Sequence, residues 1–371
     1  MTDLGTFNYQ NTTSPRGKVN LVGCTQSKLT MVARQLGERE FHAKQLWHWI
    51  YHRGVHDFDS MTNLSRHFRS TLEGGYTLRR PIVTREQTSN DGTRKWLIRF
   101  EDSQEAEAVF IPEDNRGTVC ISSQVGCTLS CRFCHTGTQQ LVRNLSSSEI
   151  VGQFMLARDS FGEWPTPKTS RRRLSNIVLM GMGEPLYNFD AVSDAINILT
   201  AGNGIAISKH RITLSTAGVV PDIRRCGETL GINLAVSLHS ANDDIRTAIM
   251  PINKKYPLKD LMAACRDYPG ISNARRITFE YVMLNEVNDS PADARALVKL
   301  LREIPSKINI IPFNPWPGAP YEASSMEAML RFQTILTDAG LTAPIRTPRG
   351  QDILAACGQL RTDSKRIKRH G

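Results

Sequence analysis

The sequence predicts an α/β fold, in which an incomplete parallel (β/α)6 barrel follows a small N-terminal helical domain. After residue 117, β-rich runs alternate with helical stretches about six times. Such repetition indicates a parallel sheet with helices outside it. Residues 27 to about 73 instead have helical periodicity throughout. A chain of 371 residues is long enough for one α/β barrel, and six units fit an open barrel better than a closed eight-stranded one.

The helical domain is clearest in the stretch EFHAKQLWHWIYHRG. Ala43, Leu46, Trp47 and Ile50 recur at i, i+3, i+4 and i+7, which puts them on one helical face. Gly54 is a natural end for this helix. The sequence therefore predicts two or three short helices before residue 90.

Basic and aromatic residues interleave along the same stretch, so it has two interpretations. It is either a solvated face behind an apolar one or a surface that contacts nucleic acid. The residues concerned are His42, Lys44, Trp47, His48, Trp49, Tyr51, His52 and Arg53. Other basic candidates are Arg171 to Arg173 and the C-terminal run RTDSKRIKRHG. The net charge of +10 favours a polyanionic partner.

The remaining elements follow in order along the chain. Residues 94–115 alternate as two strands around a polar turn. The six barrel strands are expected in 118–124, 176–181, 210–216, 232–239, 276–284 and 307–313. Helices are expected in 146–162, 189–202, 219–228, 258–268 and 290–304, the first opening with Ser146 and Glu149 in capping-box spacing. We divide the chain into a flexible terminus (1–20), a helical RNA-contacting domain (21–90), a β-rich connector (91–117), the barrel core (118–350) and a C-terminal segment (351–371).

Composition excludes several classes of protein. Hydrophobic residues make up 40% and charged residues 22%, as in ordinary globular proteins and not disordered ones. No apolar run has the length of a membrane span, and the first residues contain no secretory signal. We therefore expect a cytoplasmic protein. Clustered cysteines in a reducing compartment indicate metal binding or chemistry, not a disulfide framework.

The cluster GCTLSCRFCHTG holds Cys127, Cys131 and Cys134 with the spacing C-x3-C-x2-C. It follows the first barrel strand, at the edge where such folds place their sites. Zinc sites and ordinary iron–sulfur clusters use four protein ligands. Either a remote residue supplies the fourth ligand or the site is left open. His135 is a weak candidate, because adjacent side chains rarely converge on one metal.

This motif after the first strand of a partial barrel resembles the radical S-adenosylmethionine (SAM) superfamily. Further blocks, in order, resemble its RlmN family of RNA methyltransferases. They are SSQVGCTLSCRFCHTGTQQLVRNLSSSEIVGQ, GMGEPLYN, LSTAGVVP, AVSLHSANDDIRTAIMPINKKY, FEYVMLNEVND, IPFNPWPGAPY and RGQDILAACGQL. The resemblance covers nearly the whole chain and is strongest from about 105 to 360. HTGTQQL, after the third cysteine, departs from the family pattern without affecting a central residue.

The resemblance implies a [4Fe-4S] cluster on Cys127, Cys131 and Cys134, with SAM as the ligand of the fourth iron. It also implies SAM contacts from the ends of later strands. These are Gly183, Glu184, Ser215, Ser237, Leu238 (through its backbone), His239 and Asn314. The cysteines outside these motifs, Cys24, Cys226 and Cys265, are expected to be buried apolar residues.

The resemblance further implies a mechanism in which Cys357 receives a methyl group from one SAM. A 5′-deoxyadenosyl radical from a second SAM then takes hydrogen from that methyl group, and the resulting carbon radical adds to the adenine ring. Cys120 attacks the sulfur of Cys357, forming a transient disulfide that releases the product. Glu107 matches the family's proton acceptor, with Glu105 and Glu113 as local alternatives.

The implied activity is methylation of adenine carbon 2 in 23S rRNA, at the peptidyl transferase centre, and in tRNA, 3′ of the anticodon. An electron donor such as flavodoxin is implied as a partner, and a monomer is expected. Two alternatives remain open at this point. One is a paralogous enzyme that methylates carbon 8 of adenine, and the other is a non-catalytic RNA-binding protein with a structural metal.

Overall fold

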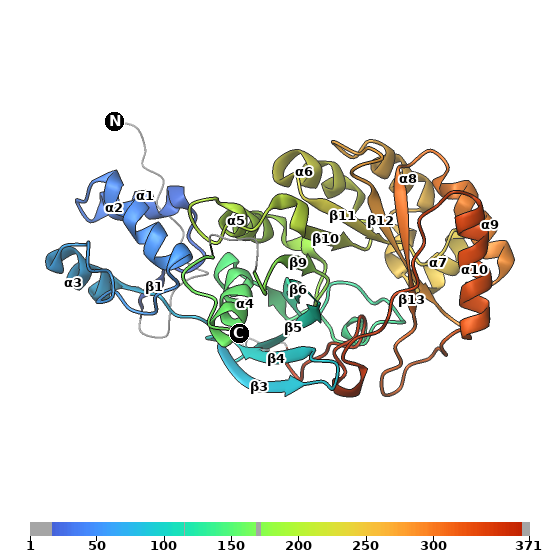
Figure 1. Ribbon diagram of the computed structural model, residues 1–371, viewed down its shortest axis with the longest axis horizontal. Coiled ribbons are helices and arrows are strands. Elements are labelled where there is room, and N and C mark those ends of the chain that lie inside the picture. Colours follow the sequence, from blue (N-terminus) through green and yellow to red (C-terminus); the bar gives the residue numbers. More distant parts are fainter. Residues whose placement is uncertain (1–16, 115, 168–171, 366–371) are drawn as a thin grey trace, which may run out of the picture.

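A nine-stranded mixed sheet organises the chain, with most helices packed outside it (Figure 1). The computed structural model describes residues 17–114, 116–167 and 172–365. The strand order is β13-β12-β11-β10-β9-β6-β5-β4-β3. All pairs from β6 to β13 are parallel, and those from β3 to β6 are antiparallel. The order confirms the partial (β/α)6 barrel, because six parallel strands stay open at β13.

The six parallel strands fall where the sequence predicts them. They are β6 (Arg116–Cys120), β9 (Asn176–Leu179), β10 (Ile212–Thr216), β11 (Asn233–Ser237), β12 (Ile277–Met283) and β13 (Ser306–Pro312). All seven residues of β12 are buried, as expected for a strand covered on both faces. Since parallel strands share one direction, their carboxyl ends meet at one rim, where the cysteine loop also lies.

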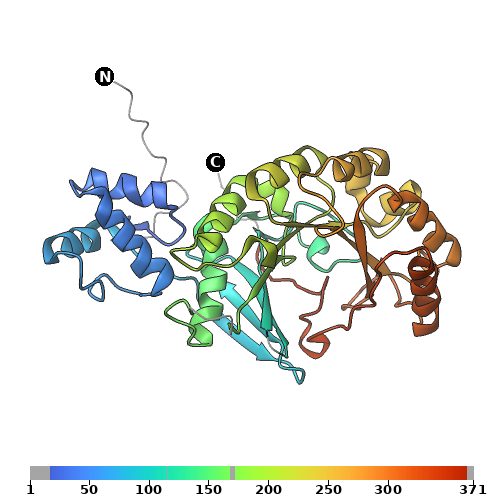
Figure 2. The same ribbon diagram turned by 45° about the horizontal axis from the view of Figure 1, so that its top comes forward.

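The five predicted barrel helices are also present. They are α4 (Ser147–Ser160), α5 (Phe189–Thr200), α6 (Val220–Leu230), α8 (Leu258–Arg266) and α9 (Pro291–Leu301). The capping box predicted for α4 is formed, with Ser146 and Glu149 each bonding the other's backbone N–H. Two helices lie outside the prediction, α7 (Asp243–Ile249) and α10 (Met326–Asp338). Figure 2 shows the helices in an arc around the strands, with the C-terminal segment on the inner side.

The N-terminal helices form a lobe beside α4 and α5. They are α1 (Gln26–Gln35), α2 (Glu40–Trp47), a π-helical turn η1 (His48–His52) and α3 (Arg66–Gly75), with a small sheet of β1 (Val19–Asn20) and β2 (Tyr76–Thr77). Tyr51 is fully buried, and its hydroxyl accepts the Gly23 N–H and donates to the carbonyl of Cys24. An ion pair of 2.6 Å between Lys28 and Asp194 joins α1 to α5. The lobe is thus packed against the barrel.

Three antiparallel strands extend the sheet beyond the barrel. They are β3 (Ile82–Thr88), β4 (Arg94–Arg99) and β5 (Glu105–Glu113). The last two are the strands predicted around a polar turn, whereas β3 was not predicted. Shorter elements complete the chain: β7 (Gln124–Val125), β8 (Arg143–Asn144) and the 3-10 turns η2 (Thr136–Thr138), η3 (Pro185–Asn188), η4 (Lys209–Arg211), η5 (Pro251–Lys254) and η6 (Gln351–Ile353). Within the described ranges, no helix is long and apolar enough to span a bilayer.

Candidate active site

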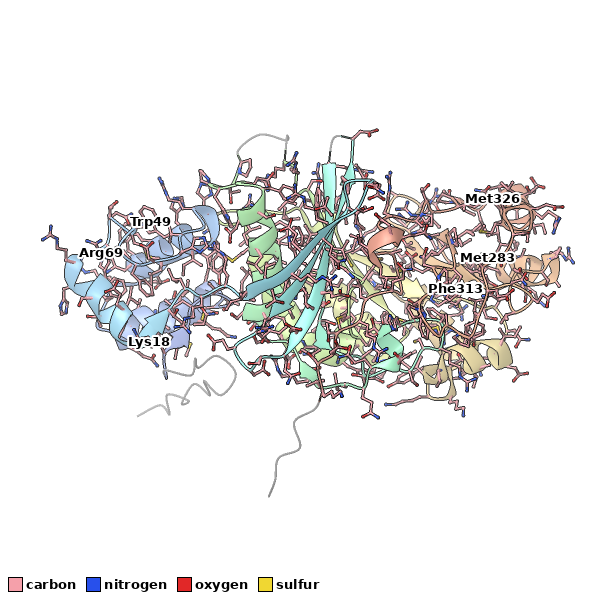
Figure 3. The ribbon with its side chains drawn as sticks, turned by 90° about the horizontal axis from the view of Figure 1, so that it is seen from below. Lys18, Trp49, Arg69, Met283, Phe313 and Met326 are labelled. Carbon is pink, nitrogen blue, oxygen red and sulfur yellow. The ribbon has the colours of Figure 1, made fainter. Side chains whose placement is uncertain are left out.

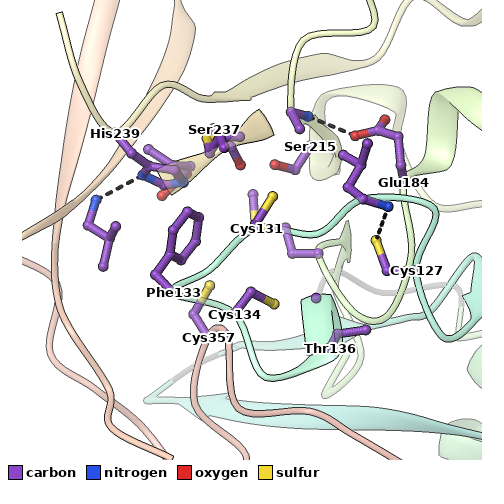
Figure 4. Close-up of a pocket in the computed structure, with 18 of the residues that line it drawn as sticks. Cys127, Cys131, Phe133, Cys134, Thr136, Glu184, Ser215, Ser237, His239 and Cys357 are labelled. Carbon is purple, nitrogen blue, oxygen red and sulfur yellow. Dashed lines mark hydrogen bonds between the residues drawn. The ribbon is translucent and has the colours of Figure 1, made fainter. Parts of the chain in front are cut away.

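A cavity of about 140 Å³ lies at the carboxyl ends of the parallel strands (Figure 4). All three clustered cysteines line it, as does Cys357 from the far end of the chain. Among the expected SAM contacts, the cavity is also lined by Gly183, Glu184, Ser215, Ser237, His239 and Asn314. Leu238, Cys120 and Glu107 do not line it. The fold therefore gathers most of the predicted site residues at one rim.

Backbone contacts fix the loop that carries the clustered cysteines. The loop leaves β7 at Gly126, where φ is +74° and a Cβ would lie 2.2 Å from the carbonyl oxygen of Gln140. A side chain is therefore excluded at this position. Further along, the Arg132 N–H donates to the carbonyl of Ile249, and the Trp316 indole donates to that of Phe133. These bonds hold the loop over the rim.

The three thiols fit an iron–sulfur cluster by donor type and by position. Cys131 lies close enough to Cys134 and Cys127 for their charges to raise its pKa, after the larger effect of burial. Thiolates are the ligands that such clusters require. As they stand, no three His, Cys, Asp or Glu side chains in the described residues form a ready metal-holding group. The Cys127 sulfur accepts the Leu129 N–H at 3.3 Å, a type of bond that is also usual for cysteine sulfurs that bind an iron–sulfur cluster.

Glu184 follows β9 and projects its carboxyl group to the cavity wall. Its two oxygens accept the N–H groups of Ala217 at 2.7 Å and Leu186 at 3.1 Å. Burial raises the pKa of Glu184 to about 7 despite these bonds. Beside it, Gly183 has a φ of +99°, and a Cβ there would lie 2.5 Å from Gln124. A buried carboxylate with a glycine next to it can approach an ammonium or amino group closely.

His239 is held as a neutral imidazole beside the cavity. Its Nδ1 accepts the Val282 N–H at 2.9 Å, which leaves the hydrogen on Nε2. Burial, with a smaller contribution from Arg246, lowers its pKa to about 3. Its φ of +59° is unusual for a non-glycine residue. The N–H groups of Leu238 and His239 both donate to the carbonyl of Glu280, which fixes this turn.

Leu238 itself is fully buried, and both of its backbone polar groups are already bonded. Its carbonyl accepts from Arg246 Nε at 3.0 Å, and Arg246 also donates to the carbonyls of Ser237 and Ala217. The Arg246 side chain is fully buried. It therefore ties the ends of β10 and β11 together, a positioning role that no sequence motif had indicated.

The loop that carries Cys357 is bound on both sides. Asn314 donates from Nδ2 to the Cys357 carbonyl at 3.2 Å and accepts from Gln351 Nε2 at 2.9 Å. On the cysteine-loop side, the His135 N–H donates to the Gly358 carbonyl at 2.7 Å. Cys357 is exposed as a residue but lines the cavity, and desolvation by the surrounding protein raises the pKa of its thiol, with additional contributions from Glu280 and Cys120. Asn314 thus holds the loop that carries Cys357 and also lines the cavity.

Both ring nitrogens of His135 face the C-terminal segment. Nδ1 lies 3.2 Å from the Gln359 carbonyl oxygen, and Nε2 lies 3.1 Å from an Arg361 nitrogen. The ring stacks on Trp316 at a centroid distance of 4.8 Å. His135 therefore connects the two loops. Both of its ring nitrogens are occupied there, whereas the sequence had offered it as a weak candidate for the fourth metal ligand.

Comparison with known proteins identifies the family. The sequence model described as the ribosomal RNA large subunit methyltransferase N-terminal domain matches residues 19–77, and that of the radical SAM superfamily matches residues 121–298. A dual-specificity RNA methyltransferase RlmN from Rhodospirillum rubrum is 66% identical over 94% of this chain and 81% of its own length. Another, from Paramagnetospirillum magneticum, is 62% identical over 94% of this chain and 77% of its own length. The chain belongs to the RlmN family.

A solved structure supports the same conclusion at the level of the fold. A radical SAM methyltransferase from Sphaerobacter thermophilus superposes with a TM-score of 0.85 and 42% identity, over 92% of this chain and 99% of that one. This member of the RlmN family is thus a radical SAM methyltransferase. The non-catalytic alternative is wrong, because the superfamily is one of SAM-cleaving enzymes.

The RlmN resemblance implied Glu107 as the base, with Glu105 and Glu113 as local alternatives, and the environments of these three glutamates differ. Glu107 is the most buried of the three and pairs with Lys95, Nζ to Oε1, at 2.9 Å. The Arg361 N–H also donates to Glu107, which links this residue to the C-terminal segment. Glu105 pairs with Arg99 at 3.0 Å, and Glu113 pairs with Arg116, both nearer the surface.

Cys120 lies at the end of β6, buried behind the cavity wall. Burial raises the pKa of its thiol to about 12. Cys24, Cys226 and Cys265 are also buried, as predicted, and all eight cysteines are free. Cys120 is the buried cysteine that acts on the pKa of Cys357, so the two sulfurs lie in the same region.

Two of the residues proposed for nucleic-acid contact are in the core instead. Trp47 and Tyr51 are buried, so of the two interpretations left open the apolar face is correct for these residues; their aromatic rings pack 4.4 Å apart inside the lobe. Trp49 remains partly exposed, with the Arg53 guanidinium 4.9 Å from its ring. Figure 3 places Trp49 at one end of the molecule and Phe313, from the cavity, toward the other.

The other basic candidates are described only in part. Arg172 donates to the carbonyls of Ile205, Ala206 and Pro167, so its guanidinium holds backbone in place. Arg173 is exposed. Arg171 and the last six residues of the basic tail lie outside the described residues.

Proposed function

We propose that this protein methylates carbon 2 of adenine in RNA through an S-methylcysteine intermediate. The observation that carries the proposal is the meeting of Cys357 with the three clustered cysteines around one cavity. This arrangement brings a thiol from the end of the chain to the same cavity as the loop at 127–134, where both can act on a common reactant. Carbon 2 of adenine is a poor nucleophile, so its methylation calls for a radical route, which the superfamily supplies.

Cys127, Cys131 and Cys134 would hold a [4Fe-4S] cluster, and the cavity wall beyond them would hold SAM. A bound cluster would supply the electron that cleaves SAM and so generates the 5′-deoxyadenosyl radical. Glu184 would accept hydrogen bonds from the amino group of SAM, while Gly183 allows it a close approach. Ser215, Ser237, His239 and Asn314 would complete the SAM contacts, with Leu238 acting only through the turn that it shares with His239.

Cys357 would accept the methyl group and carry it to adenine as a carbon radical. The covalent adduct between Cys357 and RNA is a thioether, which is stable, so a second sulfur is needed to release it. Cys120 would attack the Cys357 sulfur, form a disulfide and free the methylated base. Forming that bond needs the Cα atoms to approach within about 7 Å, so the proposal depends on Cys120 remaining next to Cys357.

Glu107 would remove the proton from carbon 2. Desolvation raises the pKa of this carboxyl group, and the charge of Lys95 opposes the shift. Such a group can be a carboxylate near neutral pH and still accept a proton. Glu107 lies beside the C-terminal segment and not in the cavity wall, so adenine would have to enter between the Cys357 loop and β5.

We propose adenines of 23S rRNA, at the peptidyl transferase centre, and of tRNA, 3′ of the anticodon, as substrates. The net charge of +10, the exposed Lys44 and Arg53 and the partly exposed Trp49 of the N-terminal lobe support an RNA partner. The relatives' printed names give the dual RNA specificity. An electron donor such as flavodoxin would reduce the cluster, and the enzyme would act as a cytoplasmic monomer.

Nucleoside mass spectrometry tests this function directly. Anaerobically reconstituted protein is incubated with SAM, a reductant and unmodified 23S rRNA or tRNA. The expected product is 2-methyladenosine in both RNAs, and none when Cys357→Ala replaces the wild type. 8-Methyladenosine would establish the paralogous activity instead, and modification of only one RNA would contradict the dual specificity.

A further inference from the structure

A second, larger cavity, here called the inner cavity, runs through the inside of the barrel. It reaches the wall of the cavity lined by the clustered cysteines and Cys357, here called the reaction cavity. The inner cavity has a volume of about 610 Å³. Met180, Glu280, Ile311, Asn314 and Cys357 line both cavities. The reaction cavity therefore has a second connection, which leads away from the rim where SAM and RNA would enter.

The inner cavity has a mixed lining with many polar side chains, which is unusual for a barrel interior normally filled by branched apolar side chains. Every parallel strand contributes at least one inward polar side chain. These are Thr118, Asn176, Thr213, Asn233, Thr278 and Asn309, with Lys307 beside them. A space of this size and polarity holds water. It can therefore conduct protons between the reaction cavity and solvent.

Glu280 lies where the two cavities meet. It is the fourth residue of β12 and only 7% exposed. Among the described residues, its carboxyl group receives one hydrogen bond, from Asn309 Nδ2 at 2.9 Å. No Lys, Arg or His in that part of the chain is within ion-pair distance of it, which distinguishes it from Glu107 with its Lys95 partner. A buried carboxyl group without a counter-ion is costly to ionise. Groups of this kind in a cavity are therefore candidates for a chemical function.

Burial and the neighbouring polar and charged groups together set the pKa of Glu280. Burial raises the pKa of Glu280 to about 7, although the Asn309 hydrogen bond and the charges of Arg346 and Lys307 lower it. After burial, Glu280 is the strongest influence on the Cys357 thiol. A group that titrates near neutral pH is suited to accept and release a proton in each cycle.

We propose that Glu280 accepts the proton of the Cys357 thiol when that cysteine is methylated. This inference rests on the proposed function. The Glu280 carboxylate takes the proton from Sγ, directly or through one water, as the sulfur lone pair forms the new S–C bond. The bond between the methyl carbon and the sulfonium sulfur of SAM breaks, leaving its electron pair on that sulfur. The products are S-methylcysteine, protonated Glu280 and S-adenosylhomocysteine, the neutral thioether that remains of SAM.

The polar inner cavity then takes the proton from Glu280 to solvent. This route matters because SAM fills the reaction cavity at that moment. Glu280 and Glu107 would thus serve different protons, one from the thiol and one from carbon 2 of adenine. With Glu184 assigned to the amino group of SAM, each of the three buried carboxyl groups of the site then has a separate role.

The test separates the two half-reactions. Methylation of Cys357 is followed in a single turnover by quenched peptide mass spectrometry, without RNA. We expect Glu280→Gln to slow it by about 100-fold at pH 7, the usual size of a general-base contribution. Once the variant has been methylated by long incubation, it should transfer the methylene to RNA at the wild-type rate. Asp260→Asn removes an exposed carboxylate on α8, outside both cavities, and should leave both rates unchanged.

A cluster-free measurement complements the kinetics. Infrared difference spectra of the unloaded protein should contain buried protonated carboxyl bands from Glu280 and Glu184, which both titrate near pH 7, and Glu280→Gln should remove only one of them. If that variant unfolds, Glu280→Asp, with its carboxyl group drawn back, should show the same selective slowing. Wild-type methylation by Glu280→Gln, or equal loss of both half-reactions, would overturn this inference alone. A wild-type protein that never gains a methyl group on Cys357 would overturn the proposed function as well.

Discussion

Lys95 and Glu107 form a buried ion pair of 2.9 Å at the base of the loop that carries Cys357. Lys95 Nζ also donates to the Leu354 carbonyl at 3.1 Å, three residues before Cys357. One cation therefore balances the charge of the proposed base and anchors the loop of the methyl-carrying cysteine. The Lys95 side chain therefore connects the proposed base with the loop that carries Cys357.

Replacing Lys95 with methionine should destabilise the protein by roughly 3–5 kcal/mol, because it leaves a buried carboxyl group without its partner. Urea unfolding followed by circular dichroism measures this loss. Adding Glu107→Gln should restore much of the stability, whereas Lys209→Met, at an exposed position, should have little effect. A loss below about 1 kcal/mol for Lys95→Met would show that the pair is not maintained in solution.

Replacing Cys120 with alanine should trap the reaction after RNA has become attached. Methylation of Cys357 and addition to adenine do not need a second thiol, whereas release does. We expect the variant to purify with RNA that survives denaturing gel electrophoresis. Cys357→Ala should carry no RNA, and Cys226→Ala, at a buried position elsewhere, should resemble the wild type. Normal turnover by Cys120→Ala without trapped RNA would exclude its role in release.

Replacing Cys131 with alanine should abolish cluster binding, since two thiolates cannot hold a [4Fe-4S] cluster that already has an open iron. Iron and sulfide analysis after anaerobic reconstitution should fall from about four irons per chain to near zero. Cys127→Ala and Cys134→Ala should behave in the same way, while Cys265→Ala should load fully. Retention of a full, SAM-cleaving cluster by the triple variant contradicts the assignment.

His239 should make the folded protein sensitive to acid. Its pKa is about 3 in the folded state, against an ordinary value near 6.5. The unfolded chain therefore binds the proton first, and stability falls as pH decreases from 6.5 toward 3. We expect this residue to account for a loss on the order of 2 kcal/mol at pH 5 relative to pH 7. The comparison is urea unfolding at both pH values.

His239→Asn keeps an acceptor for the Val282 N–H but does not titrate, so it should lose less stability on acidification than the wild type. His67→Asn, at an exposed position, should retain the wild-type pH dependence. Equal acid sensitivity of the wild type and His239→Asn would mean that the imidazole is protonated within the fold.

Most of the barrel could be predicted from the sequence, because buried parallel strands are continuous apolar runs and amphipathic helices separate them. Strand β3 was missed for a physical reason. In IVTREQT, nearly every residue is exposed and Ile82 is 66% exposed, so no alternation of buried and exposed positions marks the strand. Helix α7 is too short for periodicity to stand out. Its sequence resembles that of any solvated helix, although Arg246 on it is buried.

The candidate site was predictable only where a residue belongs to a contiguous motif. Spacing identified Cys127, Cys131 and Cys134, and family resemblance identified Cys357. Lys95 and Glu280 could not be found in this way, because each sits inside an ordinary strand and acquires its environment from segments distant in the sequence. Conversely, Trp47 and Tyr51 looked like part of an RNA-contacting surface until packing showed which helical face is inside.

The fixed position of the Cys357 loop has a consequence for the choice of substrate. Asn314 Nδ2 and the His135 N–H donate hydrogen bonds to the carbonyls of Cys357 and Gly358, so the loop is held at the barrel rim. An adenine stacked in a helix cannot present carbon 2 to a sulfur at the wall of this cavity, and the nucleotide must be turned out of its stack to reach it. Such extrusion costs a few kcal/mol and is easiest for unpaired bases. Selection among adenines is therefore decided partly by how readily each one unstacks.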